Sequence, residues 1–175
     1  MSDTRPMVTG LFPDRHSAEA AYTAAEARGY TANDMNLVMS DDTRKTHFTG
    51  STAGIETELG NKAAEGAGIG GAIGGTIGAI AAAVAAVGTS IALPGLGLVI
   101  AGPIAAAIAG AGAGAASGGL IGALMGWNMP EERVKQYEEG MKTGGILMGL
   151  RAKDDADAEH LESAWKSNRG QLVYR

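Results

Sequence analysis

The feature that most constrains this chain is a run of 65 consecutive residues without charge. No Asp, Glu, Lys, Arg or His occurs from Gly66 to Pro130, although charged residues make up 19% of the 175-residue chain. Apolar surface of this extent is unfavourable in water, so the run must be covered by protein or by lipid. The chain therefore divides into a charge-free block and two flanking segments of ordinary composition.

Glycines recur every four residues in both halves of this block. Because four residues make nearly one helical turn, each set would line one face of a helix, where another backbone can approach closely. LPGLG at 93–97 and the Gly102-Pro103 pair separate the halves, since Pro and Gly break helices. The pattern predicts a long glycine-zipper α-helical hairpin over 61–127. The expected packing residues are Gly66, Gly70, Gly74, Gly78, Gly110, Gly114, Gly118, Gly122 and Gly126. The expected turn residues are Pro94, Gly95, Gly97, Gly102 and Pro103.

The first flank has the pattern strand, helix, strand. The apolar run at 7–12 stops at a Pro-Asp pair and predicts a strand. Asp14 is a suitable N-cap for a following helix, and Gly29 suits the left-handed position after its end. Residues 35–39, MNLVM, predict the second strand.

The second flank repeats this pattern. GGILMGL at 144–150 predicts a strand, Asp154 or Asp155 begins a helix, and QLVY at 171–174 predicts a final strand. Two β-α-β units make a ferredoxin-like plait, an α+β fold in which two helices cover one face of a four-stranded antiparallel sheet. We therefore expect a βαβ…βαβ plait with the helical hairpin inserted between its halves.

The boundaries follow from the segments between these elements. Residues 40–60 are polar without a clear period and predict an exposed loop or linker. A short helix capped by Asn128, with Pro130 in its first turn, is expected to link the block to the plait. The expected organisation is half of the plait plus linker at 1–60, the hairpin at 61–127, and the connecting helix with the other half at 128–175.

The motifs point to no catalytic, metal-binding or cofactor-binding site. GAGIGG at 66–71 matches the dinucleotide pattern G-x-G-x-x-G, but no strand precedes it. Three histidines lie in separate segments without metal-ligand spacing, and we expect them to be exposed. Three aspartates at a helix start are explained by the helix dipole. These residues are His16, His47 and His160, and Asp154, Asp155 and Asp157. We expect a protein that is not an enzyme and that has no cofactor.

Composition narrows the partners and the location. The net charge of −5 offers no basic field for phosphates, so nucleic acid is not expected. The absence of cysteine fits a reducing compartment, and MSDTRPMVTG lacks the apolar core of a signal peptide. We expect a cytoplasmic protein, with membrane association as the alternative.

Five apolar residues of the flanks allow either a ligand cleft or an ordinary core, and their spacing favours core. They are Tyr22, Met35, Met39, Met148 and Trp165. A small-molecule ligand is therefore not expected. Trp127 is open to two interpretations, an interfacial membrane anchor or a plug at the base of the hairpin.

The glycine content indicates how the block is covered. Eight glycines between Gly66 and Leu93 oppose helix formation by roughly 0.8 to 1 kcal/mol each relative to alanine, so close packing must compensate. The eight Ile, Val and Leu residues of that span favour bilayer insertion by only about 0.3 to 0.6 kcal/mol each. We expect a homo-oligomer assembled through the hairpin. The alternatives are a membrane-associated protein that inserts the hairpin into a bilayer, and a ligand-sensing ferredoxin-like module.

Three stretches together resemble bacterial general stress proteins of the 17M/YflT-like family, which have a central glycine-zipper region. They are the opening VTGLFPDRHSAEAAYTAAEARGY, the glycine block with its LPGLG break, and PEERVKQYEEGMKTGGILMGL. The resemblance spans nearly the whole chain, and its most specific part lies at 130–150. It implies stress-induced expression and no established enzymatic activity, and it supplies no catalytic residues.

Overall fold

The computed structural model describes residues 5–52, 90–93, 97–105, 124 and 129–175. Its strands are β1 (Met7–Phe12), β2 (Met35–Ser40), β3 (Ser90–Leu93), β4 (Leu98–Ala101), β5 (Ile146–Arg151) and β6 (Gln171–Tyr174). The helices whose two ends are described are α1 (Arg15–Ala27), α2 (Asp41–Thr52), α8 (Glu131–Lys142) and α9 (Asp155–Ser167). The described strands form one antiparallel sheet in the order β3-β4-β2-β5-β1-β6. The protein is therefore a mixed α+β fold.

The elements of both flanks form where local sequence signals predict them. The Asp14 carboxylate accepts a hydrogen bond from the Ser17 N–H at 2.8 Å and begins α1. The Asp154 carboxylate does the same for the Asp157 N–H, also at 2.8 Å, and begins α9. Gly29 has a φ of 83° after the end of α1. These observations confirm the predicted N-caps and strand, helix, strand patterns.

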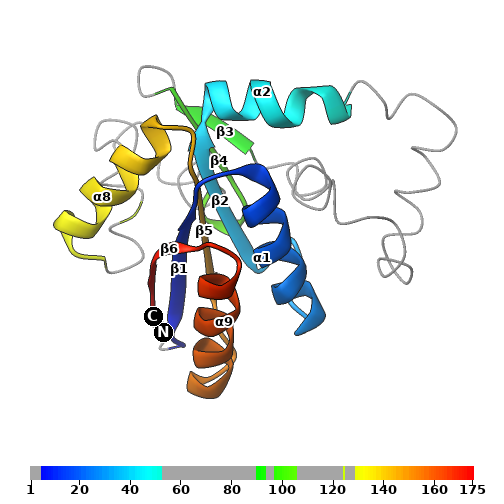
Figure 1. The fold of residues 1–175 in the computed structure, drawn as a ribbon, viewed down its shortest axis with the longest axis vertical. Coiled ribbons are helices and arrows are strands. Elements are labelled where there is room, and N and C mark those ends of the chain that lie inside the picture. Colours follow the sequence, from blue (N-terminus) through cyan, green and yellow to red (C-terminus); the bar gives the residue numbers. More distant parts are fainter. Residues whose placement is uncertain (1–4, 53–89, 94–96, 106–123, 125–128) are drawn as a thin grey trace, which may run out of the picture.

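α1 and α9 lie together on one face of the sheet (Figure 1). In the core beneath them, Phe12 and Trp165 meet edge to face with ring centroids 5.7 Å apart. The prediction that five residues of the flanks are core is confirmed, because all five are at most 2% exposed and belong to one cluster. They are Tyr22, Met35, Met39, Met148 and Trp165.

α8 covers the opposite face, so the sheet lies between helices on both sides (Figure 1). We call the apolar core on this side the α8-face cluster. Its members are Leu11, Val38, Leu98, Ile100, Ile104, Ala105, Leu124, Met129, Val134, Tyr137, Met141 and Leu147. The Tyr137 hydroxyl donates to the Leu172 carbonyl at 2.7 Å and lies 2.9 Å from the Thr9 hydroxyl, which ties α8 to β6 and β1. The two helices predicted to cover one face, α1 and α9, do so, whereas no face was predicted for the connecting helix that is α8.

The start of α8 also differs from the prediction. Pro130 is the N-cap and makes no side-chain capping hydrogen bond, whereas Asn128 lies outside the described residues. Glu131 and Glu132 stand in the first turn, where carboxylates favour the positive end of the helix dipole. Lys135 pairs with Glu131 at 2.8 Å, one turn apart.

The polar segment after β2 is a helix over much of its length, so the prediction of a loop across 40–60 is wrong for 41–52. The Ser40 hydroxyl accepts the Thr43 N–H at 3.0 Å and caps α2. Phe48 is 5% exposed and belongs to the core beneath α1, with the Arg15 guanidinium 5.0 Å above its ring. One buried aromatic therefore holds an otherwise polar helix in place. Residues 53–60 lie outside the described part of the chain.

The centre of the charge-free block is β-structure, and this corrects the prediction of a purely helical hairpin. β3 and β4 pair with each other in the register Ile91↔Ile100, and β4 also pairs with β2 in the register Val38↔Ile100. LPGLG thus joins two strands, and the sheet has six described strands where four were predicted. β4 is paired on both sides, by β3 and by β2, and its β-branched Val99 and Ile100 suit a buried strand. The helices predicted over the rest of 61–127 fall outside the described residues, apart from Pro103, Ile104, Ala105 and Leu124, which are helical.

Candidate functional site

Most of the predicted assembly residues lie outside the described part of the chain. These are the nine packing glycines, Gly66, Gly70, Gly74, Gly78, Gly110, Gly114, Gly118, Gly122 and Gly126, and the turn residues Pro94 and Gly95. GAGIGG and Trp127 fall outside it as well. The structure places the remaining turn residues, Gly97, Gly102 and Pro103, at the two ends of β4.

Gly97 and Gly102 both have left-handed backbones, but their surroundings differ. Gly97 has a φ of 61° before β4, and a Cβ there would meet nothing within 4 Å. Gly102 has a φ of 105° after β4, and a Cβ there would overlap the Met35 carbonyl oxygen. Pro103 follows as the first helical residue, where the lack of an N–H is no disadvantage. Gly102 and Pro103 therefore turn the chain out of the sheet into a helical turn.

Asn36 on β2 lies at this exit and is 7% exposed. Its amide oxygen accepts the backbone N–H of Ile104 at 2.8 Å. Its amide nitrogen donates to the carbonyl oxygen of Gly149 on β5 at 3.3 Å. One buried side chain of β2 thus bonds both to the neighbouring strand β5 and to the first turn of the segment that leaves the sheet.

Residues on either side of 106–123 pack into the core. Ile104, Ala105, Leu124 and Met129 all belong to the α8-face cluster and are at most 8% exposed. Leu98 and Ile100 of β4 join the same cluster. The charge-free block is therefore anchored in the fold at several points.

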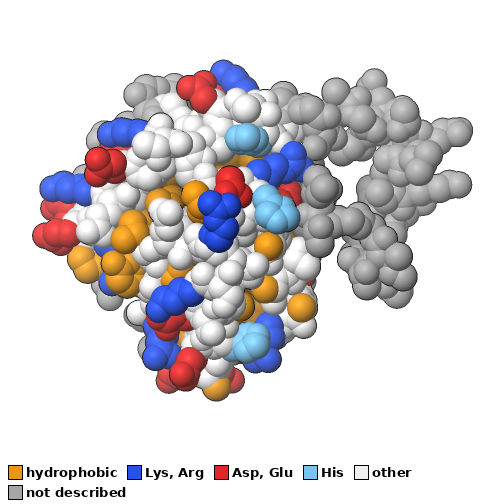
Figure 2. All heavy atoms as spheres, viewed as in Figure 1, with side chains coloured by type: hydrophobic (Ala, Val, Ile, Leu, Met, Phe, Trp, Pro, Cys, Tyr) orange, Lys and Arg blue, Asp and Glu red, His pale blue; other side chains and the backbone are white. Residues whose placement is uncertain are grey.

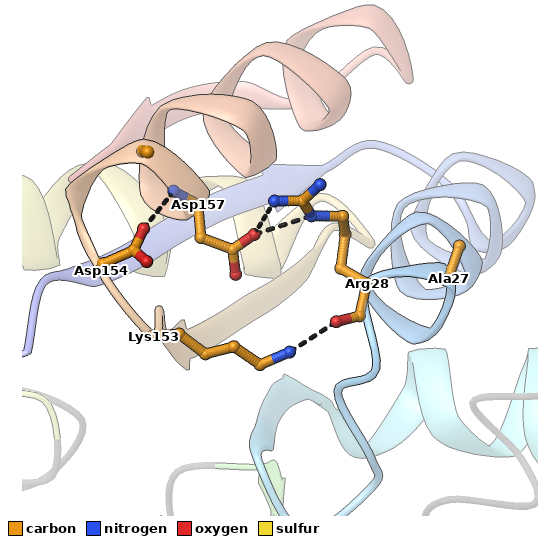
Figure 3. A pocket seen from close by; sticks show the side chains of 6 residues that line it. Ala27, Arg28, Lys153, Asp154 and Asp157 are labelled. Atoms are coloured by element: carbon orange, nitrogen blue, oxygen red, sulfur yellow. Dashed lines mark hydrogen bonds and ion pairs between the residues drawn. The ribbon is translucent and has the colours of Figure 1, made fainter.

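A separate, charged hollow of about 380 Å³ opens where the end of α1 meets the start of α9 (Figure 3). The Arg28 Nε donates to the Asp157 carboxylate at 2.7 Å, and a second guanidinium nitrogen contacts the same oxygen. The Lys153 ammonium donates to the Arg28 carbonyl oxygen at 2.6 Å. Ala27, Asp154 and Ala156 complete the lining.

Tyr30 adds hydrogen bonds to Asp157 and to the backbone of Lys153. Its hydroxyl donates to the Asp157 carboxylate and accepts the Lys153 N–H at 2.9 Å. Burial opposes ionisation of Asp157, but the hydrogen bonds from Tyr30 and Arg28 outweigh it and lower the pKa of the carboxyl. Burial and the hydrogen bond to Asp157 raise the pKa of Tyr30 to about 12. Both groups are therefore held in their usual charge states at neutral pH.

This arrangement joins two helix ends rather than activating a reacting group. The cations that line the hollow are already bonded to Asp157 and to a backbone carbonyl, and a carboxylate or phosphate entering it would also meet Asp154. Asp154 caps α9, and Asp155 and Asp157 stand in its first turn, where the helix dipole favours carboxylates, but Asp157 also accepts hydrogen bonds from Arg28 and Tyr30. Across the described ranges, no three His, Asp or Glu side chains are grouped so as to hold a metal ion.

The surface carries no field of one sign on the face drawn in Figure 2, where Lys, Arg, Asp and Glu side chains are interspersed. His16, His47 and His160 are exposed, as predicted. In the part of the chain that the structure describes, no helix combines the length and the apolar character needed to cross a membrane.

Comparison with known proteins returns no match to a family model, to a curated protein or to a solved structure. Inference about function therefore depends on the geometry of the chain itself.

The contacts of two groups of residues were not predicted from the sequence. Asn36 is a lone amide within an apolar strand, MNLVM, and that isolation is the signal that it has a buried partner. Arg28 and Tyr30 flank the glycine that ends α1, and no local pattern indicates that they meet Asp157, more than 120 residues later.

Proposed function

We propose that this protein is a non-enzymatic stress-response protein that assembles into a homo-oligomer through its charge-free block. Its flanks form a ferredoxin-like plait, in which β2, β5, β1 and β6 are the four strands and α1 and α9 cover one face. The stress context comes from the resemblance of the flanks and the block to general stress proteins. The rest of the proposal comes from how the block is attached to the sheet.

One observation carries the proposal: the charge-free block leaves the sheet and returns to the same fold. β3 and β4 belong to the sheet, and the chain on both sides of 106–123 packs in the α8-face cluster. The block is therefore neither a tail nor a domain on a linker. Its uncharged segments are connections with both ends fixed on one body.

The length of the second connection argues against a bilayer-spanning hairpin. Residues 106–123 are 18 residues that join Ala105 to Leu124, and both of these lie in the α8-face cluster. A single crossing would place the two ends on opposite sides of a membrane, and crossing twice takes about 40 residues. This connection is too short to cross and return.

The first connection meets the same limit. Between α2 and β3 the uncharged part is 66–89, or 24 residues, and it is preceded by Glu56, Glu58, Lys62 and Glu65. Both α2 and β3 belong to the body around the sheet. Two crossings again need about 40 apolar residues. Spanning is therefore disfavoured for either half of the block.

Self-association would cover this apolar surface without a bilayer. Among the described elements, α1, α2 and α9 occupy one face of the sheet and α8 the other. The glycine spacing of the uncharged connections suits close packing of backbone against backbone, which copies of the same segment can supply to each other.

Static light scattering of purified protein without detergent tests the proposal. A particle mass of two or more 17.6 kDa chains supports it, and a monodisperse monomer contradicts it. Flotation with liposomes tests the runner-up, in which the block enters one leaflet. Co-flotation at both low and high salt, together with a monomeric mass in solution, would favour the runner-up instead.

A further inference from the structure

The amide of Asn36 lies where the charge-free block leaves β4. β4 ends at Ala101, which pairs with Leu37, and Asn36 is the next residue along β2. Its oxygen accepts the Ile104 N–H at 2.8 Å, and its nitrogen reaches the Gly149 carbonyl on β5 at 3.3 Å. Both polar ends of this buried amide are therefore used, one on the sheet and one on the exit.

Gly102 reinforces the exit from the backbone side. Its φ is 105°, and an added Cβ would overlap the Met35 carbonyl oxygen and lie 3.0 Å from the Cα of Asn36. The Ala105 N–H donates to the Gly102 carbonyl at 3.0 Å and closes the first turn. The backbone of Gly102 thus passes directly against β2.

The hydrogen bond to Ile104 resembles a helix cap, but the cap comes from another strand. The first N–H groups of a helix lack partners within the helix, and a neighbouring side-chain oxygen usually supplies one from within the same segment. Here the acceptor is 68 positions away in sequence. A cap supplied by β2 fixes the helical turn in relation to the sheet as well as satisfying the N–H.

We propose that Asn36 is a positioning residue for assembly: it sets the direction in which the block leaves the sheet, identically in every copy of the chain. This inference rests on the proposed self-association. Copies that share one exit geometry can pack their uncharged segments without first losing orientational freedom, which favours association. Loss of the Asn36 amide should therefore weaken assembly by more than its effect on folding explains.

Asn36→Leu tests this, with Thr9→Val as the matched control. Leucine has nearly the shape of asparagine but cannot bond to Ile104 or Gly149. Thr9 is also a buried polar residue of the sheet, 1% exposed, but its hydroxyl meets Tyr137 and no residue of the block. Sedimentation over a concentration series gives the assembly midpoint, and hydrogen exchange of the Ile104 amide reports on the contact itself.

We expect the assembly midpoint to rise at least tenfold in Asn36→Leu and less than threefold in Thr9→Val, both measured below their melting temperatures. Exchange at Ile104 should accelerate at least tenfold in Asn36→Leu alone. Equal midpoints for the two variants would overturn the inference. So would rapid exchange of Ile104 in the wild-type protein, a measurement that needs no variant to fold. A monomeric wild type would instead refute the proposed function, while the exchange data still decide whether the Asn36 contact exists.

Discussion

The guanidinium of Arg28 at the end of α1 contacts the carboxylate of Asp157 in the first turn of α9, with Nε and Oδ1 2.7 Å apart. Each charge lies at the helix end where the helix dipole stabilises it, the cation at a C-terminus and the anion at an N-terminus. The pair joins the two flanks of the sheet domain, which the charge-free block separates in the sequence. The strength of this ion pair therefore contributes to the free energy of unfolding of the sheet domain.

Replacement of Asp157 by Asn should destabilise the protein. Asp157 is 4% exposed and accepts hydrogen bonds from Arg28 and Tyr30, so the change removes the charge from a buried acceptor. Hydrogen bonds to charged groups contribute about 1.5 to 3 kcal/mol, and we expect a loss in that range. Urea denaturation of both proteins at pH 7 measures it.

Asp155→Asn is the control, because Asp155 stands in the same first turn but is exposed. It loses only an interaction with the helix dipole, about 0.3 to 1 kcal/mol. Equal losses for the two variants would show that the contact with Arg28 contributes little.

The stability difference between wild type and Asp157→Asn should depend on pH. The pKa of Asp157 is lowered from 3.8 in the folded protein, where hydrogen bonds from Tyr30 and Arg28 outweigh the effect of burial. A carboxyl with a lowered folded pKa contributes stability that is complete well above pH 3.8 and is lost as the pH falls below it. Denaturation at pH 7, 5, 4 and 3 should therefore give a difference that is constant from 7 to 5 and then narrows. A constant difference down to pH 3 would contradict the lowered pKa.

Gly102→Ala should destabilise the protein more than Gly144→Ala. The two glycines have nearly equal φ values of 105° and 100°, so alanine at either position incurs left-handed strain of about 1 to 2 kcal/mol. Only at Gly102 does the added Cβ overlap another atom, the Met35 carbonyl oxygen, whereas nothing lies within 4 Å of it at Gly144. Thermal and urea denaturation of both variants compares the two losses. Similar losses would mean that the chain does not pass against β2 at Gly102 as described.

Local signals in the sequence were sufficient for the flanks. Asp14 and Asp154 cap their helices because a carboxylate three residues before an unpaired N–H is a short-range interaction. The strands β1, β2, β5 and β6 follow from short apolar runs bounded by glycine, proline or a capping aspartate. None of these features depends on distant residues, which is why each could be predicted.

Features that depend on distant contacts could not be predicted. LVIA is short and apolar, and such a run fits a buried helix as well as a strand until its partner β2 is known. α2 is polar apart from Phe48, whose packing depends on the position of α1. The contact between Asn36 and Ile104 spans 68 residues and has no local signal beyond the isolation of an amide in an apolar strand.

The glycine spacing itself gives the sharpest test of the proposed assembly. Gly74 and Gly118 stand near the middle of their four-residue series, where we expect backbones to approach most closely. Leucine raises helix propensity by roughly 0.8 to 1 kcal/mol over glycine, so an isolated or lipid-facing helix should tolerate it or gain stability. In a close-packed interface the larger side chain should instead cost about 1 to 3 kcal/mol per site, repeated in every subunit.

Ala83→Leu is the control, because residue 83 lies in the same uncharged run as Gly74 but about half a helical turn away from the face that carries the glycine series. Light scattering should show dissociation, or a clearly higher assembly midpoint, for Gly74→Leu and Gly118→Leu, and a particle close to wild type for Ala83→Leu. The penalty multiplies with subunit number, so a destabilisation that is small in one chain becomes large in the assembled particle. If both glycine variants assemble and melt like Ala83→Leu, the glycines do not mark a packing surface, and the charge-free block must be covered in another way.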